Sequence, residues 1–326
     1  MPALPSPAPF TVAAIQASPE PMDQTQCLAR GLERLADLVT EAAANGAKLV
    51  ACGETFLPGY PAWIDSCPGA LTWDNPETKR VFADYRRHSV AIPGPAHDRL
   101  RSIAADNGIV LVVGVSERVD EGPGQGSLYN SLLTYDADGR LANHHRKLVP
   151  TFTERCVWGH GDQAGLRSVK TAVGRVSGLV CWEHWMPLPR QALHEQGETI
   201  HIAVWPTVHE RHQIASRHYA FEGRTHVIAV GQVQRAGTHM PKGWARMEGV
   251  GDDDLLLRGG SCVIAPNGDF LTVPVFDTES IIYAEVDPNR ADEESMTLDV
   301  TGHYHRAELF EFGVRPSSRS THEPPC

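Results

Sequence analysis

The sequence lacks the features that would attach a protein to a membrane or to nucleic acid. It has no stretch of about 18 consecutive apolar residues and no basic segment followed by an apolar one near its start, so neither a membrane span nor a signal peptide is expected. No basic run is longer than residues 144–147 (HHRK), and 29 Lys and Arg against 40 Asp and Glu give a formal net charge of −11. Such an acidic chain is not expected to bind nucleic acid or an anionic membrane surface.

Paired cysteines are also missing. The seven cysteines are odd in number, widely spaced and without any CxxC pair. Neither a disulfide framework nor a zinc ribbon is therefore predicted, and a reducing cytoplasm is the expected location. Residues 209–212 (HERH) are one residue short of the HExxH zinc motif, so no metal site is predicted either.

No linker or internal repeat divides the chain, which predicts a single domain over residues 10–312. Residues 1–9 contain four prolines and are predicted to be a disordered arm. The Ser- and Pro-rich residues 313–326 are predicted to be a disordered tail.

Apolar periodicity predicts strands and helices in mixed order. A strand at 10–17, an amphipathic helix at 24–45 and a strand at 48–52 open the chain, and residues 75–106 are predicted to be mainly helical. Further predicted elements are a strand at 109–116, hairpins at 127–145 and 168–181 (the second turning at Gly174-Arg175), strands at 200–206, 227–234, 261–265, 270–275 and 281–286, and helices at 186–196 and 212–225. Such a mixture, with strand-helix-strand units at both ends and hairpins between, indicates an α/β fold of two sheets faced by helices.

Three polar residues stand where a predicted strand runs into a loop. They are Glu54, Lys147 and Cys181. Each has an ordinary explanation when it is considered alone: a buried cysteine packs as a small hydrophobe, and a charged residue beside a strand is usually solvated. Together they supply a thiol nucleophile, a carboxylate to accept its proton and a cation to stabilise charge on a substrate. Burial beside Cys52 and Phe56 is expected to raise the proton affinity of Glu54, which suits a base that works near neutral pH.

The residues around these three positions resemble the nitrilase superfamily of carbon-nitrogen hydrolases. The resemblance rests on residues 53–61 (GETFLPGYP), 145–151 (HRKLVPT) and 178–183 (GLVCWE), with weaker likeness at 154–159 (ERCVWG) and 297–304. It extends over about residues 10–312 and implies an αββα sandwich with a Cys-Glu-Lys triad. It also implies that there is no cofactor, and that the chain forms homodimers that build into larger or spiral assemblies.

The resemblance also assigns roles to further residues. Glu154 would hold the ammonium group of Lys147 in place. His184 stands where many nitrilases carry asparagine, and Ala307-Glu308 replaces a common Pro-Asp pair, so the role of the tail in assembly is less defined. The aromatic residues near the three motifs are candidates for the substrate pocket, although packing explains them equally well: Tyr60, Trp158, Trp182, His184 and Trp185.

The function that the resemblance implies is hydrolysis of a small organic nitrile to a carboxylic acid and ammonia, through a thioimidate and a thioester on Cys181. Trp182 after the cysteine favours a nitrilase over an amidase or carbamoylase with the same triad. An enzyme that hydrolyses cyanide remains an alternative, as does a catalytically silent assembly protein, which would be expected to lose a triad residue. The sequence does not distinguish aliphatic, aromatic and arylacetic nitriles.

Overall fold

A computed structural model describes residues 8–22 and 26–316. Within these ranges the chain forms fourteen strands and eight α-helices, more than the sequence pattern predicts. The additional elements are mostly short, because a two-residue strand or a four-residue helix leaves no periodic signal in the sequence. The predicted tail lies mostly outside the described residues, as do residues 1–7 of the predicted arm, so the predicted domain boundaries stay a prediction.

The first sheet is seven-stranded, in the order β14-β1-β2-β4-β5-β6 with β3 beside β4. β1, β2 and β4 are parallel, whereas β5 and β6 continue the sheet as an antiparallel hairpin. Its strands are β1 (Phe10–Gln16), β2 (Ala47–Cys52), β3 (Val90–Ala91), β4 (Val110–Arg118), β5 (Leu128–Tyr135), β6 (Leu141–Arg146) and β14 (Ser280–Val286).

The second sheet is also seven-stranded, in the order β11-β12-β10-β9-β8-β7 with β13 beside β12. Its centre is parallel, since β8, β9 and β10 run in one direction. Its strands are β7 (Val169–Thr171), β8 (Gly174–Val180), β9 (Ile200–Val204), β10 (His226–Val230), β11 (Val233–Arg235), β12 (Leu255–Ile264) and β13 (Phe270–Phe276).

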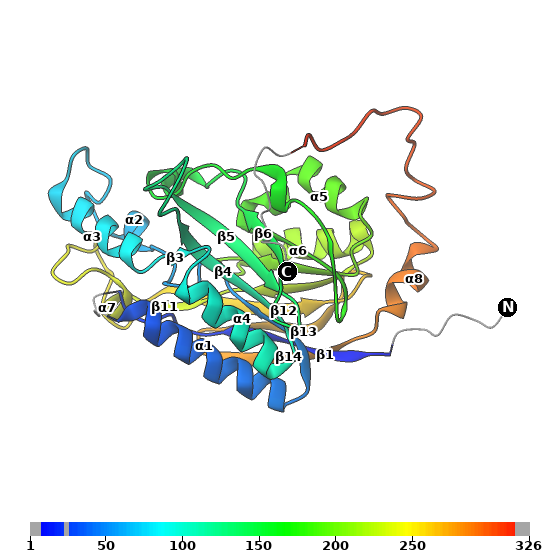
Figure 1. The fold of residues 1–326 in the computed structure, drawn as a ribbon, viewed down its shortest axis with the longest axis horizontal. Helices are drawn as coiled ribbons and strands as arrows, with labels where there is room; N and C mark the ends of the chain where they lie inside the picture. The colour runs from blue at the N-terminus through cyan, green and yellow to red at the C-terminus, as the bar shows by residue number, and fades with distance from the viewer. Residues whose placement is uncertain (1–7, 23–25, 317–326) are drawn as a thin grey trace.

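Helices cover the outer face of each sheet, as Figure 1 shows. The α-helices are α1 (Cys27–Ala44), α2 (Trp63–Ser66), α3 (Pro76–Arg87), α4 (Pro95–Asn107), α5 (Pro187–His194), α6 (Glu210–Gly223), α7 (Ala236–His239) and α8 (Asn289–Ser295). Three 3₁₀ helices join them: η1 (Phe152–Cys156), η2 (Gln163–Gly165) and η3 (Cys181–Trp185). In the described residues no helix is both long and apolar enough to cross a bilayer.

The alternation of side chains along β2 shows how the layers are held together. Val50 faces α1 and α4, where Leu35 and Leu100 pack on the outside of the first sheet. Leu49 points the opposite way and belongs to the core that lies between the two sheets. Neighbouring residues of a strand face opposite sides of its sheet, so one strand serves two cores. The arrangement is an α/β sandwich with the layer order αββα, which confirms the predicted fold class.

Two predicted strands have different bounds in the structure. The strand expected at 227–234 is interrupted at Gly231 and Gln232, and these residues separate β10 from β11. The strand expected to begin at Ser261 begins at Leu255, because β12 extends to pair with β11. The predicted turn at Gly174-Arg175 is also displaced, since both residues already belong to β8.

Candidate active site

Glu54 lies two residues beyond the end of β2 and is completely buried. Its Oε1 accepts hydrogen bonds from Asn130 Nδ2 at 2.7 Å and from Lys147 Nζ at 3.0 Å. Gln232, in the interruption between β10 and β11, donates its side-chain amide to the carbonyl of Glu54. Glu54 Oε2 has no hydrogen-bond partner among the described residues, so it is the oxygen available to accept a proton.

Gly114 of β4 allows the backbone around Glu54 to approach the sheet. A Cβ atom at this position would lie 2.3 Å from the carbonyl oxygen of Gly53 and 2.6 Å from the backbone nitrogen of Thr55. Both contacts are with backbone atoms, which cannot rotate away. Any residue with a side chain at Gly114 would therefore displace the turn that carries Glu54.

Lys147 follows β6 and is also completely buried. Its Nζ donates to Glu54 and, at 2.6 Å, to Oε2 of Glu154. Glu154 lies on η1, where it also accepts a hydrogen bond from the backbone nitrogen of Thr151 at 2.8 Å. Tyr60 donates its hydroxyl to the other oxygen of Glu154 at 3.0 Å. The ammonium group is thus held between two carboxylates, one of which is itself fixed by two donors.

Cys181 is the first residue of η3, directly after β8. Its φ angle of 53° lies in the left-handed region, which costs a residue other than glycine on the order of 1–3 kcal/mol. Ligand atoms of Glu54, Glu154 and Cys181 all lie within 4.8 Å of one another. The structure therefore brings together the three predicted triad residues and Glu154, each from a different strand end or loop.

Burial dominates the electrostatics of these groups. Burial, opposed by the charge of Lys147, raises the pKa of Glu54 to about 7, which is the direction that desolvation of a carboxyl predicts. Burial also raises the pKa of the Cys181 thiol well above its ordinary value. Burial alone would lower the pKa of Lys147, but the negative charges of the neighbouring carboxylates Glu54 and Glu154 raise it. The resting site therefore holds a thiol and an ammonium, and the thiol needs a base before it can attack.

The same geometry argues against a metal ion. The carboxylates of Glu54 and Glu154 and the thiol of Cys181 are a suitable donor set by type. Lys147 Nζ, however, lies within hydrogen-bond distance of both carboxylates and supplies the positive charge between them. A cation at this position would have to displace a buried ammonium.

The predicted pocket residues separate into two groups. Trp182 and Trp185 on η3 are exposed, with 56% and 45% of their surfaces accessible. Tyr60 and Trp158 lie inward with ring centroids 6.0 Å apart, and Trp158 donates its indole N–H to Ser116. His184 is buried with its ring stacked on Trp205. Contact of any of the five with a substrate stays a prediction.

Glu183 has a role that the sequence analysis missed, although it was part of the motif around the cysteine. This buried carboxylate accepts hydrogen bonds from the backbone nitrogens of Val180 and Leu148, both at 2.7 Å, and from His145 Nε2 at 2.9 Å. Burial would raise its pKa, but His145 and the two backbone donors hold that pKa below the ordinary value. Glu183 thus joins the segment that carries Lys147 to the segment that carries Cys181.

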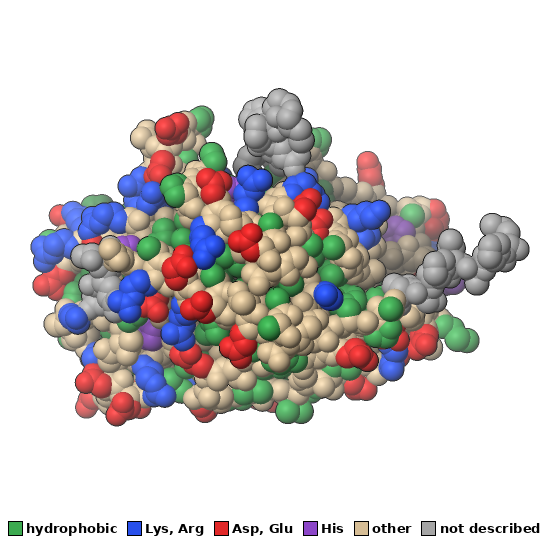
Figure 2. Space-filling view, turned by 60° about the horizontal axis from the view of Figure 1, so that its bottom comes forward, with side chains coloured by type: hydrophobic (Ala, Val, Ile, Leu, Met, Phe, Trp, Pro, Cys, Tyr) green, Lys and Arg blue, Asp and Glu red, His purple; other side chains and the backbone are tan. Residues whose placement is uncertain are grey.

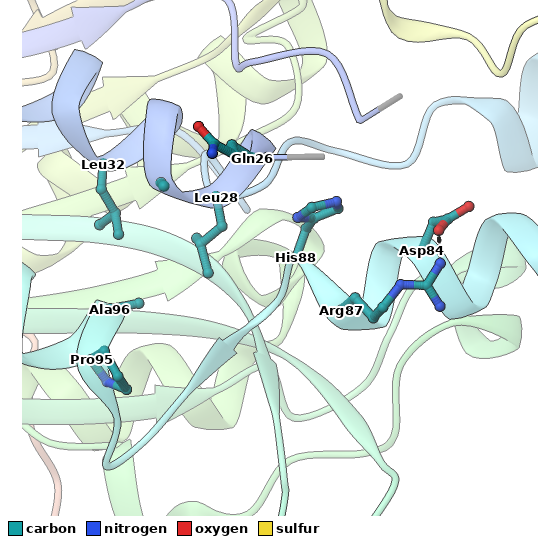
Figure 3. Close-up of a pocket in the computed structure, with 9 residues that line it drawn as sticks. Gln26, Leu28, Leu32, Asp84, Arg87, His88, Pro95 and Ala96 are labelled. Atoms are coloured by element: carbon teal, nitrogen blue, oxygen red, sulfur yellow. Dashed lines mark hydrogen bonds and ion pairs between the residues drawn. The ribbon is translucent and has the colours of Figure 1, made fainter. Parts of the chain in front are cut away.

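A sizeable cavity lies elsewhere in the molecule. It has a volume of about 600 Å³ and lies between α1, α3 and the start of α4, as Figure 3 shows. Its lining includes Leu28, Leu32 and His88 beside the ion pair of Arg87 with Asp84. No residue of the Glu54, Lys147 and Cys181 cluster lines it, so its size does not identify it as the site of chemistry.

Comparison with known proteins assigns the chain to a family. The profile of the carbon-nitrogen hydrolase family matches residues 11–294. This chain belongs to the carbon-nitrogen hydrolase family. It is 36% identical over 312 residues to "Nitrilase 2" from an unknown prokaryotic organism, covering 95% of this chain and 93% of that protein. It is 35% identical over 315 residues to an "Aliphatic nitrilase" of Sinorhizobium fredii, covering 95% and 97%.

The fold agrees as well. The crystal structure of a carbon-nitrogen hydrolase from Helicobacter pylori superposes with a TM-score of 0.67 at 20% identity, covering 93% of this chain and 97% of that one. Membership of the family confirms the expectation that the protein is a hydrolase acting on carbon-nitrogen bonds. The alternative of a non-enzymatic assembly protein is set aside.

The role of Glu183 predicts the effect of replacing it with glutamine. Glu183→Gln keeps the shape of the side chain but turns an N–H group toward Val180 or Leu148, so one buried backbone donor loses its acceptor. We expect the free energy of unfolding in urea to fall by about 1–3 kcal/mol, and turnover to fall with it. The matched control is Glu285→Gln on the exposed side of β14, which should leave both within the error of measurement. An unchanged stability and rate in Glu183→Gln would contradict this role.

Proposed function

We propose that this protein is a nitrilase that converts an organic nitrile to its carboxylic acid and ammonia. The observation that carries the proposal is the unpartnered Oε2 of Glu54 in a cluster that holds the Cys181 thiol and the Lys147 ammonium. The two relatives described above, both named as nitrilases, support the choice of substrate class. Trp182 after the nucleophile supports the same choice.

The first half of the reaction uses the base, the nucleophile and the cation in turn. Glu54 takes the proton from Cys181 Sγ, and the thiolate forms a bond to the nitrile carbon. One π bond of the nitrile breaks, and its nitrogen receives the proton from Glu54 to give a thioimidate. Lys147 stabilises the negative charge that develops on this nitrogen, in a buried site where such stabilisation is strong.

The second half consumes two water molecules. Glu54 takes a proton from the first water, which adds to the thioimidate carbon to give a tetrahedral intermediate. Proton delivery to its nitrogen lets ammonia leave, and a thioester remains on Cys181. A second water, activated in the same way, releases the carboxylic acid and restores the thiol. Glu154 keeps Lys147 in position throughout, and misplacement of a catalytic group alone can cost on the order of a hundredfold in rate.

The test is a panel of substrates followed by ammonia release and chromatography of the products. The panel contains cyanide and aliphatic, aromatic and arylacetic nitriles, each organic nitrile with its matching amide. We expect acid as the main product and slower hydrolysis of the amides. Mass spectrometry during turnover should place the covalent adduct on Cys181. The variant Cys181→Ala should lose both the adduct and the formation of product.

The matched control is Cys156→Ser, because Cys156 is an exposed free thiol. This variant should keep the adduct and the rate. An adduct on Cys156 or Cys262 would contradict the assignment of the nucleophile. Faster hydrolysis of an amide than of its nitrile would move the protein to the amidases or carbamoylases of the family.

We further propose that α5 and α6 form a contact with a second copy of this chain, in a homodimer that can extend to larger or spiral assemblies. The two helices are joined by the ion pair of Arg190 with Glu222 at 2.7 Å. They leave large apolar side chains exposed on their outer side, namely Leu188, Ile214 and Phe221. Exposed apolar groups of this kind on neighbouring helices mark an interaction surface, and self-association would cover them.

The mass of the protein, measured by light scattering as it elutes from a size-exclusion column, tests this contact. Phe221→Glu should lower the measured mass toward that of one chain, because a carboxylate would be buried in the contact without a partner. Val273→Glu on β13, also an exposed apolar position, is the control and should leave the mass unchanged. An unchanged mass in both variants would contradict the proposed surface.

The remaining expectations stay predictions. Figure 2 shows that acidic and basic side chains are interspersed over one face of the molecule, which supports the expectation of no nucleic-acid partner. A cytoplasmic location and the absence of a cofactor are likewise proposed from the sequence.

A further inference from the structure

A second buried polar cluster lies next to Cys181, and the reaction above does not use it. Its members come from β8, η3, α5, β9, α6 and the turn before β9. All are buried in the described structure: Ser177, His184, His194, Glu198, His201 and Tyr219. Buried polar groups in such number need a complete set of partners, and their arrangement shows which donor serves which acceptor.

Three contacts connect this cluster to the nucleophile. His184 Nδ1 lies 2.7 Å from the backbone carbonyl oxygen of Cys181. On the other side of the same ring, Nε2 lies 3.0 Å from Nε2 of His201. His201 Nδ1 lies 3.0 Å from a carboxylate oxygen of Glu198. The result is a continuous chain of side chains from Glu198 to the backbone of Cys181.

The acceptor at the Cys181 end of the chain fixes the tautomer of His184. A carbonyl oxygen can only accept, so the proton of this contact is on Nδ1 of His184. Burial, with the neighbouring His201, lowers the pKa of His184 well below its ordinary value, so the ring is neutral and its Nε2 is an acceptor. His201 must then donate from Nε2, and because its Nδ1 faces the carboxylate of Glu198, which only accepts, its ring donates from both nitrogens as the imidazolium of an ion pair with Glu198. A histidine in this position orients its neighbour, as the partners of metal-bound histidines do.

Glu198 anchors the far end. It accepts hydrogen bonds from His194 Nδ1 at 2.8 Å and from the hydroxyl of Tyr219 at 2.6 Å, and Ser177 contacts its second oxygen. Burial would raise its pKa, but His201 and His194 lower that pKa to about 2, so it is an anion. The line of hydrogen-bonded side chains that leads to Cys181 therefore begins at the fixed negative charge of Glu198.

The other contacts of His184 restrict it further. Its ring stacks on Trp205 with centroids 4.7 Å apart. Arg190 donates to the backbone carbonyl of His184 at 3.1 Å while its guanidinium pairs with Glu222. A ring that is stacked on one face and held at both nitrogens can support a strained neighbour, and Cys181 is in the left-handed region.

We propose that His184 is a positioning residue for the nucleophile: its Nδ1–H holds the Cys181 carbonyl, and His201 and Glu198 hold His184. In this arrangement the left-handed backbone of Cys181 keeps Sγ directed at Glu54 and Lys147. The catalytic consequence rests on the proposed nitrilase reaction. The geometric consequence, a correctly placed thiol, does not depend on the substrate.

Two replacements of His184 by side chains of similar size, asparagine and leucine, separate the loss of the hydrogen-bond donor from the loss of side-chain volume. His184→Asn retains an N–H group that can reach the Cys181 carbonyl, whereas His184→Leu does not. We measure the rate at which iodoacetamide alkylates Cys181, by mass spectrometry, because this reaction needs no nitrile. Leucine should slow alkylation at least tenfold, and asparagine should restore it to within a few-fold of the wild-type rate.

Nitrile turnover is measured on the same proteins, and leucine should lower kcat while KM changes little. The matched control is His97→Asn, a buried histidine on α4 that contacts the hydroxyl of Tyr135 and should alkylate like the wild type. Wild-type alkylation of a folded His184→Leu would overturn the proposal. If the alkylation rates differ as predicted but neither the wild type nor any variant turns over a nitrile, the proposed function is contradicted and the positioning role stays supported.

A measurement on the unaltered protein covers the case in which His184→Leu does not fold. Nitrogen-15 NMR of the histidine rings distinguishes the two neutral tautomers, and the spectrum of His184→Asn assigns the His184 signal by its disappearance. A neutral ring protonated on Nδ1 is the expected result. A ring protonated only on Nε2 could not donate to Cys181 and would overturn the proposal.

Discussion

The buried ammonium of Lys147 is the group on which the rest of the site depends. It lies between the carboxylates of Glu54 and Glu154, and all three side chains are buried. Removing charges from water is costly, and an ion pair offsets that cost only when its geometry is good and its remaining hydrogen bonds are made. Here Asn130, Tyr60 and the backbone of Thr151 supply those bonds. Of the oxygens of these two carboxylates, only Oε2 of Glu54 has no hydrogen-bond partner among the described residues.

Such a group can persist only if the backbone that carries it is held rigidly. Gly114 lets the turn of Glu54 lie directly on β4, and Gln232 holds the carbonyl of the same residue. Glu183 then ties the segment after Lys147 to the end of β8, one residue before Cys181. Each of these contacts acts on backbone atoms, which explains how the site can hold Cys181 in a strained backbone conformation. Position is fixed by the two sheets and not by the reacting side chains themselves.

The sequence predicts the parts of this structure that have periodic or local signals. The helical spacing of Leu32, Leu35 and Val39 in α1, the mixed order of predicted strands and helices, and three motifs at strand ends were enough for the layers and the central cluster. The break at Gln232 and the left-handed φ of Cys181 were not predictable, because both depend on contacts distant in sequence. The buried histidine chain was missed for the same reason. His184 and His201 are separated by 17 positions and have no shared motif.

The pH dependence of kcat/KM tests most directly whether burial and the neighbouring charges set the pKa of Glu54, the proposed base. Glu54 must be ionised to accept the Cys181 proton, so kcat/KM should rise with pH through about 7, where its raised pKa lies. The charge of Glu154 contributes to that raised pKa, and Glu154→Gln would also leave Lys147 to pair with Glu54 alone. The account predicts that this variant has a lower rate and that its acidic limb moves to lower pH. A wild-type limb near 4.5, the ordinary value for a glutamate, or a limb that does not move in Glu154→Gln, would contradict it.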